Sequence, residues 1–521
     1  MQNSTASNKN NVFREFCKYA SLSVLAMAAI SCYILADTFF ISAGLGADGL
    51  TALNLAIPVY NFIHGTGLML GMGGATRFAV CRSRSDHAGG NAMFTATLWL
   101  GAAFSLLFVA LGILCPTQLA QLLGADGVTL PMTRTYLQVL LLFSPAFILN
   151  DILLCFNRND GAPQLSMAAT VSGSLANILL DYVFIFPCGM GMFGAVLATG
   201  LAPVIGVGVS SLHFLRKKNS YRPAKILPKP AHMRYNFALG FPSLVEQLSA
   251  AIVIIVFNYI ILGLEGNAGV AAYGVVANIS LVVSAVFTGI AQGMQPLLSR
   301  AHGEGDEKRA RRIFTYASCS MLALAVLLYA AVFFFAAPIA AIFNGDGNAA
   351  FGEMAAHGLR LYFLAAAFVG GNTLLCAYFT SVERALPAHI LSLLRGLVVI
   401  IPCTFLFAAI WKITGVWLSY PATEALVCAV GFVLFFLNHA KTKKARPKTE
   451  PSPHLRQKNK RSPIAPFHTK NKRQLTDRNF SNAAACIFTF IPYSDTKIKC
   501  IDRRKKAHRQ HRWTFFIRFL E

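Results

Sequence analysis

The sequence predicts an all-α, polytopic membrane protein with twelve transmembrane helices, arranged as two six-helix lobes that are related by a parallel pseudo-twofold repeat. Three observations support this fold class: the apolar composition, the alternation of charge between loops, and a faint internal repeat. Of the 521 residues, 55% are hydrophobic and only 13% are charged. A soluble protein of this length would need far more polar surface to cover its core.

The apolar residues are gathered into windows that are long enough to cross a bilayer. A membrane-spanning helix needs roughly 20 apolar residues. Twelve such windows follow one another along the chain, near residues 18–42, 51–74, 92–115, 133–156, 163–187, 191–215, 236–263, 270–297, 312–338, 356–380, 386–410 and 414–438. Bulky apolar side chains occur on all sides of most windows, so these are not amphipathic surface helices.

The loops between the predicted spans alternate in charge. Five loops that follow odd-numbered spans contain no Lys or Arg, among them GLGADG at 44–49 and LEGNAG at 264–269. Loops that follow even-numbered spans are basic, among them RFAVCRSR at 77–84 and EKRARR at 307–312. Because positive residues stay on the cytoplasmic side of a membrane, both termini are predicted to be cytoplasmic.

The two halves of the chain repeat each other faintly. A shift of 220 residues places four small residues on identical ones, namely Gly46 on Gly266, Gly49 on Gly269, Ala52 on Ala272 and Gly73 on Gly293. Six spans per half is an even number, so both halves share one orientation, as in parallel-repeat transporters. The predicted organisation is a cytoplasmic segment (1–17), an N-lobe (18–215), an inter-lobe loop (216–235), a C-lobe (236–438) and a tail (439–521).

The tail differs in character from the rest of the chain. From Lys441 to Glu521 there are 22 Lys and Arg against 5 Asp and Glu, a balance of +17 out of a total of +24. The leading interpretation is a disordered cytoplasmic tail that touches anionic lipid headgroups. Nucleic-acid binding lacks a folded module to support it, so no nucleic-acid partner is expected. An accidental extension of the reading frame is the third interpretation.

The twelve cysteines occur singly, without a CxxC motif or a Cys/His cluster. This pattern indicates neither a zinc site nor a disulfide framework, and we expect no cofactor.

Two carboxylates inside predicted spans lie at the same depth. An ionisable group in a membrane helix costs on the order of 3 kcal/mol or more by insertion scales. From the helical rise, Asp37 and Asp181 both lie roughly 8–10 Å below the outer surface of the apolar layer, and Thr199 lies at roughly 12–14 Å. Asn177 shares a helical face with Asp181. The four residues predict an oxygen-rich site that holds Na⁺ or shares a proton; the alternative is a set of separate helix–helix hydrogen bonds.

Three other carboxylates allow more than one interpretation. Glu246 follows Pro242 by one helical turn, and it either binds a cationic substrate or a proton or has a structural role. Glu424, in the last predicted span, has either a functional or a structural role. Asp151 is predicted to be an interfacial or capping residue, because it lies near the cytoplasmic end of its span.

Several long blocks resemble the multidrug and toxic compound extrusion (MATE) family, in its bacterial multidrug-export branch. They include DTFFISAGLGADGLTALNLAIPV (37–59), LANILLDYVFIFPCGMGMFGAVLATGLA (175–202), GFPSLVEQLSAA (240–251) and GIAQGMQPLLSRAHGEGD (289–306). The resemblance covers roughly residues 15–438. It implies two six-helix lobes around a central cavity, export driven by inward Na⁺ or H⁺, and a location in the bacterial cytoplasmic (inner) membrane.

The resemblance also implies roles for individual residues. The family's cation site in the N-lobe resembles Asp37, Asn177, Asp181 and Thr199, which is the set that the depth argument selects. A complete second cation site in the C-lobe is not expected, because the tenth span has Asn372 and no inward-placed Asp. Five residues are substrate-cavity candidates: Tyr33, Glu246, Gln247, Gln292 and Glu424.

The predicted function is therefore secondary active efflux of amphipathic, preferentially cationic organic compounds in exchange for Na⁺ or H⁺. The expected partners are small-molecule drugs and membrane lipid, and no obligate protein partner is evident. A flippase for lipid-linked saccharides would need several basic residues in its cavity, whereas Arg395 is the only one well inside a span. An enzyme is not expected, because HExxH, GxSxG and Walker A motifs are absent. A receptor would need larger outer loops.

Overall fold

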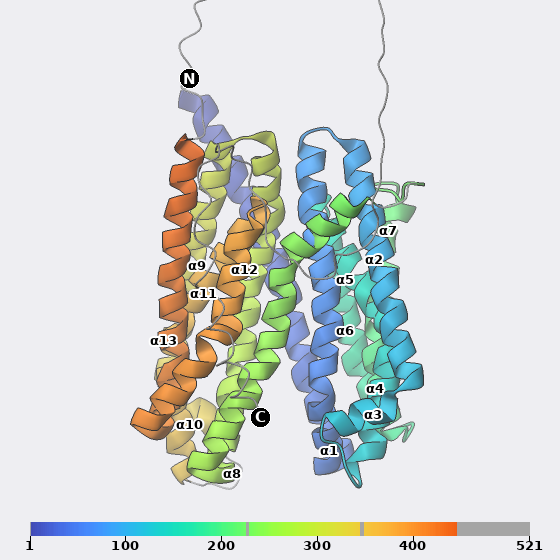
Figure 1. Cartoon of the computed structure of the whole chain (residues 1–521), viewed down its shortest axis with the longest axis vertical. Coiled ribbons are helices and arrows are strands. Elements are labelled where there is room, and N and C mark those ends of the chain that lie inside the picture. Colours follow the sequence, from blue (N-terminus) through green and yellow to red (C-terminus); the bar gives the residue numbers. More distant parts are fainter. Residues whose placement is uncertain (1, 226–228, 344–348, 445–521) are drawn as a thin grey trace, which may run out of the picture. The chain divides into compact units, whose positions relative to one another are not determined.

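The computed structural model describes residues 2–225, 229–343 and 349–444, and every secondary-structure element in these ranges is a helix (Figure 1). The predicted basic tail lies outside the described residues from 445 onward. The first half of the chain forms seven helices: α1 (Gln2–Ser83), α2 (His87–Leu114), α3 (Pro116–Leu122), α4 (Thr129–Leu142), α5 (Ser144–Asn159), α6 (Pro163–Ile185) and α7 (Gly191–Leu215).

The second half begins with another very long helix. Its elements are α8 (Pro230–Glu304), α9 (Glu307–Ile342), α10 (Ala349–Tyr362), the 3₁₀-helix η1 (Phe363–Ala365), α11 (Ala366–Ser381), α12 (Ala385–Leu393), the π-helix η2 (Leu394–Val398) and α13 (Ile400–Lys444).

The length and apolar composition of the described helices agree with the prediction of a polytopic membrane protein. Eight helical stretches in the described ranges are long and apolar enough to cross a membrane, or nine when α4 and α5, bent by 49°, form one span. Three of the stretches contain residues with non-helical backbone angles, in α1, α8 and α13. If each broken stretch crosses twice, the described helices supply the twelve predicted spans.

The breaks in α1 and α8 lie at a pair of glycines that the internal repeat matches. Gly46 has φ 67° and ψ −158°, and Gly266 has φ 63° and ψ −154°. Only glycine adopts this backbone region without severe strain. Both halves therefore begin with a pair of helices that is joined at the same conformation, which gives the sequence repeat a structural basis.

Three predicted spans are less regular than the sequence suggests. The span 133–156 is divided where α4 ends at Leu142 and α5 begins at Ser144. Pro145 stands in the first turn of α5, where its missing N–H leaves no backbone acceptor unsatisfied. The span 356–380 contains the 3₁₀-helix η1, and the span 386–410 contains the π-helix η2. Such π segments are frequent at functional sites.

Buried apolar residues form two large clusters that follow the two halves of the sequence. One runs from Ile41 to Tyr221, and the other contains residues from Phe257 to Trp417. The start of α1 belongs to the second cluster, through Val12, Phe16, Tyr19 and Ala20. Val12 and Phe16, inside the segment 1–17 that is predicted to be cytoplasmic, are helical and buried, at 5% and 1% exposed.

The long helices α1 and α8 approach each other closely at small residues. A side chain at Gly73 of α1 would strike the backbone of Asn236, and one at Gly293 of α8 would strike the backbone of Ala20. Gly73 and Gly293 are partners in the sequence repeat. Each allows the second part of its own long helix to pack against the first part of the other, as small residues commonly do between membrane helices.

Polar side chains join the two halves at the ends that the charge pattern predicts to be cytoplasmic. Arg77 donates to Glu383 at 2.7 Å, and Arg158 donates to Gln292 at 2.5 Å. Gln295 donates to Thr76 at 2.7 Å. These contacts hold the first and second halves together at this end of the molecule.

The glycine break predicts a sharp difference between two nearby substitutions. Neither Gly266 nor Gly263 would bring a new Cβ within 4 Å of another atom, but only Gly266 has a positive φ. We expect Gly266→Ala to lower the free energy of unfolding by about 1–3 kcal/mol through backbone strain. The matched variant Gly263→Ala should be at least as stable as the wild type, because alanine favours a helix. Thermal unfolding in detergent measures both, and equal melting temperatures would contradict this account of the break.

Candidate functional site

The four residues predicted to bind the coupling cation lie on three helices that pack together. Asp37 is on α1, Asn177 and Asp181 are on α6, and Thr199 is on α7. All four are buried: Asn177 and Asp181 are 0% exposed, Thr199 is 5% exposed and Asp37 is 7% exposed. The carboxyl groups of Asp37 and Asp181 are direct neighbours.

The packing of α6 against α7 places Asn177 and Thr199 at the same level. These helices are antiparallel, and Gly173 of α6 lies against the carbonyl of Ala202, while Gly194 of α7 lies against Phe184. Asn177 and Thr199 stand between these two contacts. Thr199 also interacts with Tyr136 of α4, whose hydroxyl lies within electrostatic range of both aspartates.

Five polar atoms of this cluster have no hydrogen-bond partner, whereas the Thr199 hydroxyl donates to the carbonyl of Ala195 at 3.1 Å. Asp37 Oδ1, both carboxylate oxygens of Asp181 and both amide atoms of Asn177 are buried and unpaired. Most buried polar groups in proteins have a partner, and one without a partner costs about 1–3 kcal/mol. The donor set of carboxylate, amide and hydroxyl oxygens fits a hard cation such as Na⁺, or a proton shared between the two carboxylates. Among the described residues, no group of three His, Cys, Asp or Glu side chains could hold a metal ion.

Two tyrosines connect this cluster to the middle of α1. The hydroxyls of Tyr33 and Tyr60 are hydrogen-bonded at 2.7 Å, and both lie within electrostatic range of Asp37. Tyr33 was a candidate from the family resemblance. Tyr60 and Tyr136 were not identified in the sequence, because a tyrosine in an apolar span gives no signal of its own.

The structure places Asp151 differently from the position predicted from the sequence. It is not interfacial or capping: it is 3% exposed, and its Oδ2 lies 3.0 Å from Nδ1 of His64. The glycines of α1 explain this burial, because a side chain at Gly67 would strike the Asp151 carboxylate and one at Gly71 would strike the Asp151 backbone. The ring of Tyr60 stacks on His64, with ring centroids 5.9 Å apart and an interplanar angle of 15°.

Glu424 was a substrate-cavity candidate, but it is buried among side chains of the second half. It is 1% exposed, and it accepts from Arg395 Nε at 2.5 Å and from Asn372 Nδ2 at 2.7 Å. Its carboxylate is therefore fully engaged inside the second half, with no surface free for a substrate. The side chain of Glu246 is 46% exposed, and Arg395 Nη1 lies 3.9 Å from its Oε1. Of these two carboxylates, only Glu246 is accessible.

The remaining two cavity candidates take part in contacts between the halves. Gln247 packs against Gly65 of α1, and Gln292 accepts a hydrogen bond from Arg158. Gln292 thus belongs to the contacts between the halves at the end predicted to be cytoplasmic.

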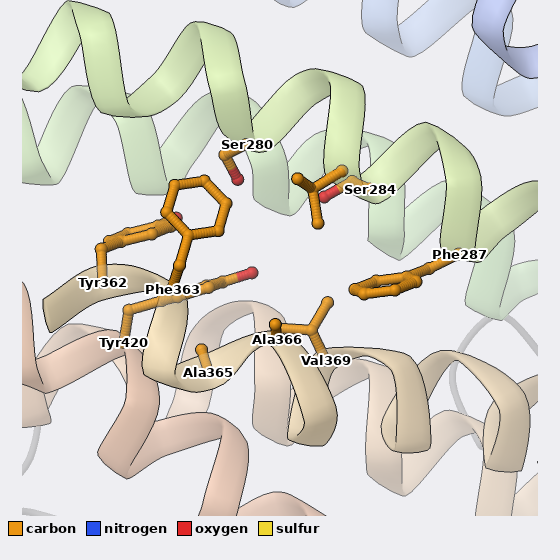
Figure 2. Close-up of a pocket in the computed structure, with 10 residues that line it drawn as sticks. Ser280, Ser284, Phe287, Tyr362, Phe363, Ala365, Ala366, Val369 and Tyr420 are labelled. Atoms are coloured by element: carbon orange, nitrogen blue, oxygen red, sulfur yellow. The ribbon is translucent and has the colours of Figure 1, made fainter. Parts of the chain in front are cut away.

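A small pocket in the second half lies beside Arg395 and Glu424. Figure 2 shows the rings of Tyr362 and Tyr420 side by side, facing the hydroxyls of Ser280 and Ser284. The two rings are stacked, with centroids 4.3 Å apart and an interplanar angle of 5°. Tyr420 also interacts with Arg395. None of the residues selected from the sequence lines this pocket.

The profile of the MatE family matches residues 23–183 and 242–406, which contain Asp37, Asn177 and Asp181 and most of both halves. The chain belongs to the MATE family. MATE proteins are membrane transporters, so this protein is a multi-pass transporter and not an enzyme. The family assignment made from the sequence blocks is thereby confirmed.

Named relatives and solved structures agree with this MATE assignment. The chain is similar to the multidrug export protein MepA of Staphylococcus saprophyticus, with 25% identity over 431 residues that cover 82% of this chain and 94% of MepA. It is similar in fold to a MATE protein solved in complex with MaL6, with a TM-score of 0.79, 22% identity and coverage of 83% and 98% of the two chains. An outward-facing multidrug resistance MATE transporter of the MOP superfamily gives a TM-score of 0.78, with 23% identity and coverage of 83% and 97%.

The buried ion pair of the second half predicts a thermodynamic cycle. Arg395→Met leaves the Glu424 carboxylate buried without its cation, and we expect a loss of about 3–5 kcal/mol in unfolding free energy. The double variant Arg395→Met/Glu424→Gln removes both charges and should recover at least half of that loss. Thermal unfolding in detergent measures the cycle.

Glu246→Gln serves as the control for this cycle. Because Glu246 is half-exposed and 3.9 Å from Arg395, its removal should cost no more than about 1 kcal/mol. A control variant as unstable as Arg395→Met would show that Glu424 is not the principal partner of Arg395.

Proposed function

We propose that the protein is a secondary active multidrug exporter that exchanges amphipathic organic cations for Na⁺ or H⁺ by alternating access. The observation that carries the proposal is the pair of buried, adjacent carboxylates Asp37 and Asp181, of which Asp37 Oδ1 and both oxygens of Asp181 have no hydrogen-bond partner. The similarity to MepA, which is named a multidrug export protein, supports export of drugs rather than uptake of a nutrient.

Coupling requires that the ion and the drug prefer different states of the protein. A ligand shifts a conformational equilibrium only through its differential affinity for the two states. Asp37 and Asp181 lie on different helices, α1 and α6. A positive charge bound between the two carboxylates draws these helices together, and its loss restores their mutual repulsion. Because linkage is reciprocal, an ion that favours the drug-releasing state is itself bound less tightly when the drug is present.

The direction of export follows from the proposed topology. The charge pattern places both termini and the basic loops in the cytoplasm. The contacts Arg77–Glu383 and Arg158–Gln292 join the halves at this end. In the proposed cycle, residues 18–215 and 236–438 move as two lobes, these contacts form when the drug is released outside, and they break when the drug enters from the cytoplasm.

Flipping of lipid-linked saccharides is less well supported. It would need free cationic groups for a pyrophosphate, but the guanidinium of Arg395 is held by Glu424 at 2.5 Å. The buried carboxylates Asp37 and Asp181 give the first half a negative character instead, which suits a cationic substrate.

The proposal is tested by removing one carboxylate of the pair. We expect Asp181→Asn to lower the rate of ethidium efflux from cells by at least about tenfold, which corresponds to the loss of roughly 1.4 kcal/mol of coupling. The amount of the variant in the membrane should not change. Asp48→Asn, on an exposed stretch of α1, is the matched control and should export ethidium normally. Normal efflux by Asp181→Asn would reject the assignment of the coupling site.

A further inference from the structure

The pair His64–Asp151 plays no part in the proposed exchange, although it is an ion pair inside the bundle. We propose that His64 and Asp151 form a second proton-binding site in the first half, and that the charge of this pair sets the affinity of the transporter for an organic cation. This inference rests on the proposed export function and adds a substrate-controlling site to it.

The geometry of the pair gives each residue a distinct role. The side chain of Asp151 is 5% exposed and that of His64 is 21% exposed, with 3.0 Å between Nδ1 and Oδ2. The carboxylate is thus shielded, whereas the imidazole is the partner that can exchange a proton or meet a ligand. Gly67 and Gly71 leave the space that Asp151 occupies. Ionisable residues inside a membrane protein are costly, and they generally mark ion or substrate pathways.

The charge of the pair depends on one proton. With His64 protonated, the imidazolium and the Asp151 carboxylate together carry no net charge. With His64 neutral, the pair has a charge of −1 and attracts a cation. Histidine is the side chain that changes its charge near physiological pH. A proton and an organic cation therefore compete for the same carboxylate, and uptake of the proton favours release of the cation.

The surroundings of His64 leave Asp151 as its dominant electrostatic partner. Among the described residues, Asp151 is the charged group that acts on the imidazole. The titratable groups on the elements packed around it are Tyr60 and Tyr33 of α1, Cys155 and Arg158 of α5, and Glu246 of α8. Glu246 is included because the neighbouring Leu244 of α8 contacts Gly65, next to His64 in α1. Glu246 lies 3.9 Å from Arg395, and Arg158 is bonded to Gln292.

The pair is connected to the first carboxylate site but distinct from it. The Tyr60 ring stacks on His64, and its hydroxyl is bonded to that of Tyr33, which lies within range of Asp37. Two acidic sites of the first half are thus joined through a pair of hydroxyl groups. A change of charge at one site alters the field at the other without direct contact.

The test is the binding of tetraphenylphosphonium to the purified full-length protein between pH 5.5 and 8.5, at constant Na⁺. We expect the affinity of the wild type to rise about tenfold or more as His64 loses its proton, since a unit charge within a few ångströms changes the ligand's free energy by at least that factor. His64→Gln is always neutral and should bind tightly at every pH. His64→Lys remains positive and should bind weakly at every pH.

Two more variants separate this inference from the proposed function. Asp151→Asn should bind weakly throughout, and Asp48→Asn, on an exposed stretch of α1 outside both acidic sites, should keep the pH step. A His64→Gln variant that retains the full pH step would overturn the inference while leaving the export function intact, as would a wild type that binds without a pH step. A wild type that neither binds nor exports organic cations would overturn both.

Discussion

Two adjacent carboxylates buried inside the helix bundle impose the constraint on which the rest of this structure depends. Asp37 and Asp181 belong to helices far apart in the sequence, and both are buried. Their burial requires α1, α6 and α7 to pack without large side chains between them, and glycines at 44, 173 and 194 provide that closeness. In the proposed function, a positive ion bound between the two carboxylates offsets the unfavourable energy of the site.

The internal repeat preserves the architecture while the chemistry of the halves has diverged. Asp151 stands 221 residues before Asn372, in matching helices. In the first half the acid pairs with His64, and the neighbouring carboxylates have unpaired oxygens. In the second half Asn372 and Arg395 satisfy Glu424. The first half therefore holds negative charge that a bound cation could balance. In the second half, Arg395 balances the charge of Glu424.

Much of the fold could be predicted because membrane helices obey simple rules of length and charge. The similar depth of Asp37 and Asp181 followed from the helical rise, and the repeat matched Gly46 with Gly266 among several pairs, without predicting the backbone conformation that they share. The His64–Asp151 pair could not be predicted, since its partners are distant in the sequence and a lone histidine carries no depth signal. Likewise, nothing local shows that Arg395 reaches Glu424, or that a π-helix carries it.

The packing of Val12, Phe16, Tyr19 and Ala20 of α1 in the second hydrophobic cluster has a consequence for biosynthesis. Phe16 and Tyr19 leave the ribosome first, yet they pack among residues that follow Phe257. The apolar face of this first segment cannot be buried until the residues of the second half that pack against it have been translated. Folding of the first half therefore depends on the second half. If the first six spans were synthesised alone, Phe16 and Tyr19 would lack the apolar residues against which they pack.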